Sequence, residues 1–235
     1  MINQISSETL CEKAYEAIRN LILRNKFLPG EVLSIESLAQ DLGVSPTPVR
    51  EALAKLSADG LVEHMRNKRV RVARITEDDV RQTYEVRRLL EPYAASLAAK
   101  RVAIDPALED DLHEIQQMAE KTQEIAVNTS INPSQYETYL GIDLRLQEIT
   151  LEALGNTLLK KVLTLVSNHS LRIRSFAEAS SNLSIGRIVR IVNGEHLAVI
   201  KALLDSNPER VQEAVQQHLN NAEDRTVQAI KRLPK

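Results

Sequence analysis

Residues 34–56, SIESLAQDLGVSPTPVREALAKL, contain two short helical patterns separated by a single glycine. A serine, which is a favoured N-cap residue, precedes the first pattern, and apolar side chains recur at helical spacing in both. The inward positions are Ile35, Leu38, Ala39 and Leu42 in the first pattern and Val49, Ala52, Leu53 and Leu56 in the second. Gly43 permits the tight turn between them, because glycine adopts positive φ at little steric cost. Two helices at this spacing predict a helix-turn-helix.

The second of these helices is expected to expose polar side chains near its start. Ser45 and Thr47 carry hydroxyls there, and hydroxyls and free backbone N–H groups at a helix N-terminus bind phosphate. Arg50 lies one turn further along, where its guanidinium can reach O6 and N7 of guanine. The pattern therefore predicts that this helix reads double-stranded DNA.

A basic hairpin follows the two helices. Residues 61–64 and 70–73 are expected to form short strands, and residues 62–74 contain five Lys or Arg residues and one acid. A basic cluster is often only a solvated surface, but next to a helix-turn-helix it predicts a wing that holds the DNA backbone. The wing candidates are Arg66, Lys68 and Arg69. The alternative is a helical pair with a surface hairpin and no ligand.

Three motifs in this region resemble the signature of the GntR family. They are LPGEVL at residues 28–33, LGVSPTPVREAL at 42–53 and GLV at 60–62. The resemblance covers about residues 15–73, and it implies a winged helix that binds a palindromic operator as a homodimer, with Arg50 as the recognition arginine. Two positions depart from the family pattern: Pro46 stands where many members have Arg, and Asn67 where the wing usually has Gly.

The rest of the chain contains long helical patterns with few breakers. We predict a DNA-binding domain at residues 1–75 and an all-helical domain at 76–235, so that the fold is mainly α. The expected helices of the second domain span residues 76–102, 106–127, 134–154, 156–179, 185–205 and 208–231. Residues 84–92, YEVRRLLEP, and 154–159, LGNTLL, resemble the FCD domain. That resemblance implies an antiparallel helical bundle with a pocket for a small carboxylic acid.

Four polar residues interrupt the apolar faces of three of these helices: Asp143, Gln147, His196 and His218. An inward polar group without a partner costs roughly 1–3 kcal/mol, so the four are expected to share one polar site. Many FCD domains bind a divalent metal through an Asp and three His at such positions. Here Gln147 replaces the first His, and its neutral oxygen is a weaker ligand. Two interpretations stay open: a site for zinc, nickel or manganese, and a metal-free pocket that binds the effector directly.

Three further residues are candidates for effector binding: Arg87, His169 and Arg172. Each lies beside apolar residues of a predicted helix. For Arg87 the alternative is an ion pair with Glu91, one helical turn away.

Composition limits the remaining classes of function. Apolar residues make up 43% and aromatic residues 3%, which favours helices packed through aliphatic side chains. The single cysteine, Cys11, cannot form an internal disulfide, and no apolar run approaches the roughly 18 residues of a membrane span. We therefore expect a soluble, cytoplasmic protein without a membrane partner.

The hypothesis that accounts for both domains is a transcription regulator, more specifically a repressor, whose operator affinity responds to an effector. A metal-dependent hydrolase built on Asp143, His196 and His218 is the enzymatic alternative. It is disfavoured because no base or nucleophile stands at motif spacing, so we expect no enzyme. A third alternative is a dimerising scaffold without a small ligand.

Overall fold

The computed structural model describes residues 10–66, 69–128, 131–179 and 183–232. The chain forms two compact units: residues 1–76 together with 169–179, and residues 77–168 together with 180–235. The boundary predicted after residue 75 lies next to the start of the second unit. The sequence did not indicate that residues 169–179 belong with the first.

The first unit combines three helices with a small antiparallel sheet. The helices are α1 (Leu10–Leu23), α2 (Ile35–Leu42) and α3 (Pro46–Ala58), and the strands are β1 (Val32–Leu33), β2 (Val62–His64) and β3 (Val70–Val72). The sheet order is β1-β3-β2. The prediction of only a two-stranded hairpin was incomplete, because Leu33 pairs with Val70 and adds a third strand. Two residues are too short a run to show an alternating pattern.

The turn between α2 and α3 is built as the sequence predicts. The side chain of Ser34 accepts a hydrogen bond from the backbone N–H of Ser37 and so caps α2. Gly43 adopts φ of +65° and its N–H bonds back to the end of α2. The predicted inward residues of α3 form the centre of this unit's core, since Val49, Ala52, Leu53 and Leu56 are each at most 1% exposed. This packing fixes which side of α3 remains exposed.

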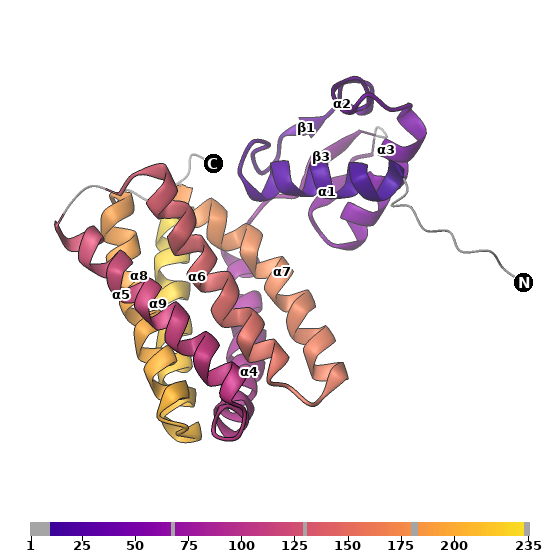
Figure 1. Ribbon diagram of the computed structural model, residues 1–235. Coiled ribbons are helices and arrows are strands. Elements are labelled where there is room, and N and C mark those ends of the chain that lie inside the picture. Colours follow the sequence, from indigo (N-terminus) through magenta and orange to yellow (C-terminus); the bar gives the residue numbers. More distant parts are fainter. Residues whose placement is uncertain (1–9, 67–68, 129–130, 180–182, 233–235) are drawn as a thin grey trace, which may run out of the picture. The chain divides into compact units, whose positions relative to one another are not determined.

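The second unit is a helical bundle, which confirms the mainly α fold (Figure 1). Its helices are α4 (Glu77–Val102), α5 (Pro106–Asn128), α6 (Pro133–Glu152), the first half of α7 (Thr157–Ala179), α8 (Ile185–Leu204) and α9 (Pro208–Lys231). α4 packs chiefly on α9, and α5 on α8. Side chains of Asn132, Ser184 and Asn207 cap α6, α8 and α9. None of the described helices is both long and apolar enough to cross a bilayer.

Candidate functional site

The first part of α3 exposes the residues predicted to read DNA. Ser45, Thr47 and Arg50 are all exposed. Ser45 is the N-cap residue, and its side chain makes no capping hydrogen bond. Pro46 and Pro48 carry no N–H, so the first turn offers fewer backbone donors than most helices. The hydroxyls of Ser45 and Thr47 are therefore the main additional donors for a phosphate.

Arg50 is available for a ligand. Over the part of the chain that the structure describes, its guanidinium makes no hydrogen bond or ion pair. It borders a hollow whose lining residues are Ile35, Arg50, Leu53, His64, Met65 and Val70. α3 and the base of the wing therefore border one concave surface.

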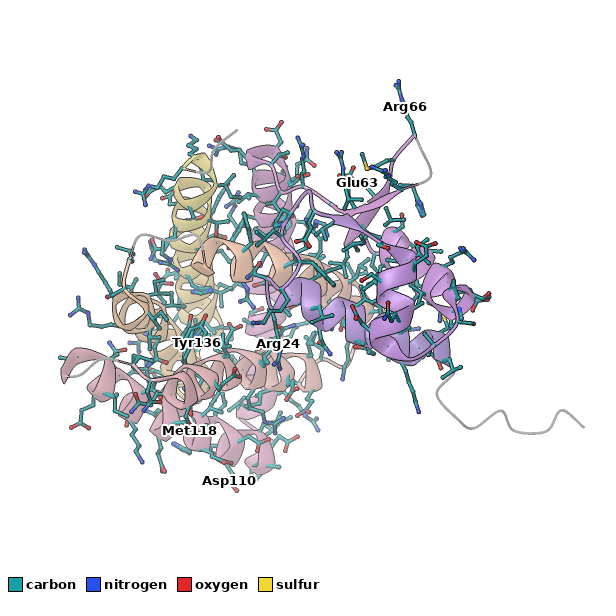
Figure 2. All side chains as sticks on the ribbon, turned by 90° about the horizontal axis from the view of Figure 1, so that it is seen from above. Arg24, Glu63, Arg66, Asp110, Met118 and Tyr136 are labelled. Carbon is teal, nitrogen blue, oxygen red and sulfur yellow. The ribbon has the colours of Figure 1, made fainter. Side chains whose placement is uncertain are left out.

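The wing is closed by a hydrogen bond from the N–H of Met65 to the carbonyl oxygen of Arg69, at 2.8 Å. Arg66 and Arg69 are exposed, and Figure 2 shows Arg66 extending away from the ribbon at this end of the wing. Lys68, the third wing candidate, and Asn67 lie outside the described residues. Arg71, in contrast, donates to Glu63 at 2.8 Å, and this hydrogen bond lowers the pKa of Glu63.

Removing one wing charge should weaken DNA binding without changing sequence preference. We expect Arg66→Ala to reduce affinity for specific and random duplexes by the same factor. The slope of log K against log salt should become shallower by about 1, because one phosphate contact is lost. Salt titrations by fluorescence anisotropy measure this slope. Lys55→Ala, on the exposed side of the last turn of α3, is the matched control, and an equal change in that variant would contradict a specific wing contact.

The second unit brings three of the four predicted polar residues together. His196 on α8 is 3% exposed, and its Nε2 lies 3.3 Å from Oδ1 of Asp143 on α6. Its ring stacks on Tyr139 at 6.4 Å between centroids and lies 5.1 Å from the ring of His218 on α9. Within the described residues, Nδ1 of His196 has no hydrogen-bond partner. We refer to Asp143, His196 and His218 as the polar cluster.

A carboxylate that the sequence did not single out holds His218. Glu195 lies 2.9 Å from Nδ1 of His218, accepts two hydrogen bonds from Arg225 at 2.7 and 2.8 Å, and accepts one from Asn221. Burial by itself would raise the pKa of Glu195, but the hydrogen bonds from His218 and Arg225 lower it to about 2. The spacing of residues 218, 221 and 225 places them on one face of α9, a signal that could have been recognised.

Desolvation lowers the pKa of His218 below its usual 6.5, and the nearby His196 and Arg87 act in the same direction, while Glu195 opposes them. His218 is therefore neutral near pH 7. Its Nδ1–H donates to Glu195, which leaves Nε2 as an acceptor.

The low pKa of His218 predicts acid sensitivity. The unfolded chain binds a proton at His218 below about pH 6.5, whereas the folded chain resists protonation, so stability falls as the pH drops below that value. Protonation of Glu195 causes a further loss of stability only at lower pH, as the pH falls from the usual pKa of a glutamate to about 2. We expect the thermal midpoint to fall between pH 7 and pH 5 and to fall less in His218→Gln. The exposed His113→Gln is the control, and equal pH slopes in the wild type and both variants would contradict this account.

Three of the predicted metal ligands, Asp143, His196 and His218, lie near one another, and Gln147 lies one turn along α6 from Asp143. Across the described ranges, no group of three or more His, Cys, Asp or Glu side chains is arranged to hold a metal ion. Nε2 of His196 faces the carboxylate of Asp143, and Gln147, one turn further along α6, offers only a neutral amide. The arrangement can donate and accept hydrogen bonds to a polar ligand without a metal.

Of the three effector candidates, Arg87 lies in the same unit as the polar cluster, and its charge lowers the pKa of His218. It is 4% exposed, donates to Glu91 at 2.7 Å, which is the predicted alternative, and lies 4.8 Å above the ring centre of Tyr84. His169 and Arg172 belong to the first unit. Arg172 is buried there and donates to the backbone oxygens of Gly60 and Ala73, while His169 is exposed.

Comparison with known proteins identifies both halves of the chain. Residues 10–72 match the family described as bacterial regulatory proteins, gntR family, and residues 82–221 match the FCD domain. The regulator LutR of Bacillus subtilis is 29% identical over 226 residues, which cover 87% of this chain and 95% of that protein.

Two other relatives match shorter stretches. A regulator of Agrobacterium vitis is 40% identical over 97 residues, covering 41% of this chain and 57% of that protein. The repressor GlaR of Escherichia coli is 33% identical over 87 residues, covering 37% of this chain and 40% of its own.

Solved structures show the same fold. McbR/YncC of E. coli matches with a TM-score of 0.72 at 18% identity, covering 94% of this chain and 98% of its own. A GntR regulator of Rhodococcus sp. RHA1 matches with a TM-score of 0.71 at 20% identity, covering 95% and 99%. The chain belongs to the GntR family of DNA-binding transcription regulators and carries an FCD effector-binding domain.

Proposed function

We propose that this regulator is a repressor that binds a palindromic operator as a homodimer through Ser45, Thr47 and Arg50. The observation that carries the proposal is the uncommitted guanidinium of Arg50, which borders the same hollow as the wing. One helix-turn-helix contacts only one half-site, so two copies are needed for specific binding. The relative GlaR is named a repressor, which supports repression rather than activation. Arg66, Lys68 and Arg69 would hold the backbone beside the helix.

We further propose that the polar cluster binds a small carboxylic acid without a metal. The buried, unpartnered Nδ1 of His196 is a place for a polar group of the effector, and desolvation makes leaving such an atom unpaired costly. The charge of Arg87 acts on His218, and this cation, which also pairs with Glu91, is the positive group nearest to hand for an acidic ligand of the cluster. Gln147 would add an amide on the same side of α6. The names of the relatives indicate a regulator and not an enzyme.

Operator release tests this proposal. Operator binding is measured by fluorescence anisotropy against a panel of small mono- and dicarboxylic acids, with protein before and after chelator treatment and with metal content measured. We expect at least one acid to weaken operator binding by about 5- to 150-fold, the usual range of allosteric coupling, equally in both preparations. An unresponsive panel would contradict the acid effector. A response that is lost on chelation and restored by zinc, nickel or manganese would contradict the metal-free site.

A ring-preserving variant locates the effector site. His196→Phe keeps the stacking partner of Tyr139 but removes both ring nitrogens. We expect it to bind the operator normally and to lose release by the effective acid, as measured in the same anisotropy assay. The exposed His113→Phe is the matched control and should respond like the wild type. Full release in His196→Phe would place the effector elsewhere.

A further inference from the structure

Asn193 is a buried amide on α8, one turn before His196 and on the same face of the helix. Its side chain is 0% exposed. Nδ2 donates to the backbone oxygen of Ala119 at 2.7 Å and to Oε1 of Gln123 at 3.3 Å, both on α5. Among the described residues, Oδ1 of Asn193 has no hydrogen-bond partner. A buried acceptor without a donor is unfavourable, so this oxygen is a place where a ligand can bind.

The orientation of the Asn193 amide is fixed by its neighbours. A backbone carbonyl oxygen can only accept, so the atom that faces Ala119 has to be Nδ2. Gln123 is held in the same way, because its Nε2 donates to the backbone oxygen of Arg190 at 3.1 Å and its Oε1 is thereby turned to Asn193. Rotating either amide would bring two acceptors together. Oδ1 of Asn193 is therefore an acceptor that the described part of the bundle does not satisfy.

The groups of the polar cluster are mostly acceptors as well. His196 turns Nε2 toward the carboxylate of Asp143, and in a neutral ring a hydrogen at Nε2 leaves Nδ1 as an acceptor. His218, whose ring lies 5.1 Å from that of His196, offers Nε2 as an acceptor. Residues three apart on a helix are neighbours, so Oδ1 of Asn193 extends this set along α8. A ligand of the cluster therefore gains most if it brings donors of its own.

We infer that the effector is a carboxylic acid that also carries a hydrogen-bond donor, a hydroxyl or an ammonium group, and that Asn193 selects it. The inference rests on the proposed acid-binding polar cluster and narrows the class of its ligand. The donor binds Oδ1 of Asn193, and the carboxylate takes the side of Arg87. A site whose buried polar group pairs with the ligand rejects analogues that lack the partner, so Asn193 is a specificity-determining residue.

Isothermal titration calorimetry on the full chain, without DNA, tests the inference. The probes are sets of three acids on one carbon chain that differ only at C2, which carries a hydrogen, a hydroxyl or an ammonium group. Succinate, malate and aspartate form one set, and butanoate, 2-hydroxybutanoate and 2-aminobutanoate form another. In at least one set we expect the hydroxy or the amino acid to bind about 5- to 150-fold more tightly than the plain acid, because only the plain acid leaves Oδ1 unpaired. The member that binds identifies the donor.

Asn193→Leu removes the acceptor and keeps an apolar side chain of similar size. The oxygen of Ala119 stays in the backbone hydrogen-bond ladder of α5, so the bundle should fold, which circular dichroism verifies. We expect this variant to bind the plain and the donor-bearing acid within about 3-fold of each other, since no buried acceptor is left to distinguish them. Asn220→Leu, at an exposed asparagine of α9, is the matched control and should keep the wild-type preference.

The outcomes separate this inference from the proposed function. Equal binding of plain and donor-bearing acids by the wild type would overturn the inference while the acid effector stands, because a retained water then satisfies Asn193. That comparison needs no variant. An unchanged preference in a folded Asn193→Leu would overturn the role of Asn193. If no acid of any set binds, the acid effector itself is wrong and the inference falls with it.

Discussion

Replacing Arg50 by glutamate should remove much of the preference for the operator over random DNA. A guanidinium that contacts guanine contributes about 1–3 kcal/mol per copy, and a dimer contributes two copies, so the loss should be at least about 30-fold. Charge reversal adds repulsion from the phosphates. Arg50 has no partner among the described residues, so the folded state should tolerate the substitution.

The control for this prediction is Lys55→Glu, which makes the same change in charge on the opposite side of the same helix. It should retain sequence-selective binding, with only a modest general loss. Fluorescence anisotropy on the operator and on a scrambled duplex gives both constants. Equal selectivity in Arg50→Glu and the wild type would show that α3 does not read the bases.

Replacing Glu195 by alanine should destabilise the bundle more than any exposed ion-pair substitution. Glu195 accepts hydrogen bonds from Arg225, Asn221 and His218, and removing it leaves these donors without an acceptor. Breaking a fully buried pair costs about 3–5 kcal/mol. Glu195 is 13% and Arg225 26% exposed, so we expect about 2 kcal/mol here. That corresponds to a thermal midpoint lower by about 4–8 °C.

Glu148→Ala is the comparison, because Glu148 is 61% exposed and shares Arg145 with other carboxylates. Its effect should stay within about 1 kcal/mol. Differential scanning calorimetry on the full chain measures both. If the thermal midpoint of Glu195→Ala is no lower than that of Glu148→Ala, the hydrogen bonds around His218 do not stabilise the fold.

Most of the fold was predictable because the signals were local. The serine before α2 and Gly43 cap and end that helix where the sequence places them, and the inward residues of α3 follow from periodicity. Strand β1 was missed as a strand because two residues carry no periodic signal and their pairing with β3 is tertiary. Arg172 was expected in the bundle because it lies on an apolar helix face. Nothing local indicates that its part of α7 belongs to the first unit.

For the polar cluster, too, the sequence predicted what depends on local patterns and missed what depends on contacts between helices. Apolar stripes predicted that Asp143, His196 and His218 face inward, and the structure brings them together. A metal-ligand arrangement depends on distances between helices, which sequence spacing does not supply. Glu195 was overlooked because it follows no apolar stripe. Its side chain lies about 100° around α8 from His196, and its role depends on how α8 packs against α9.

Titration of the wild-type protein with DNA from upstream of its own gene, against a scrambled duplex of equal length, tests the central claim most directly. At moderate salt we expect the upstream duplex to bind at least about 1000-fold more tightly. Both affinities should fall steeply when salt rises from about 50 to about 200 mM. Equal affinity for the two duplexes, or binding that does not depend on salt, would contradict operator recognition through α3 and the wing.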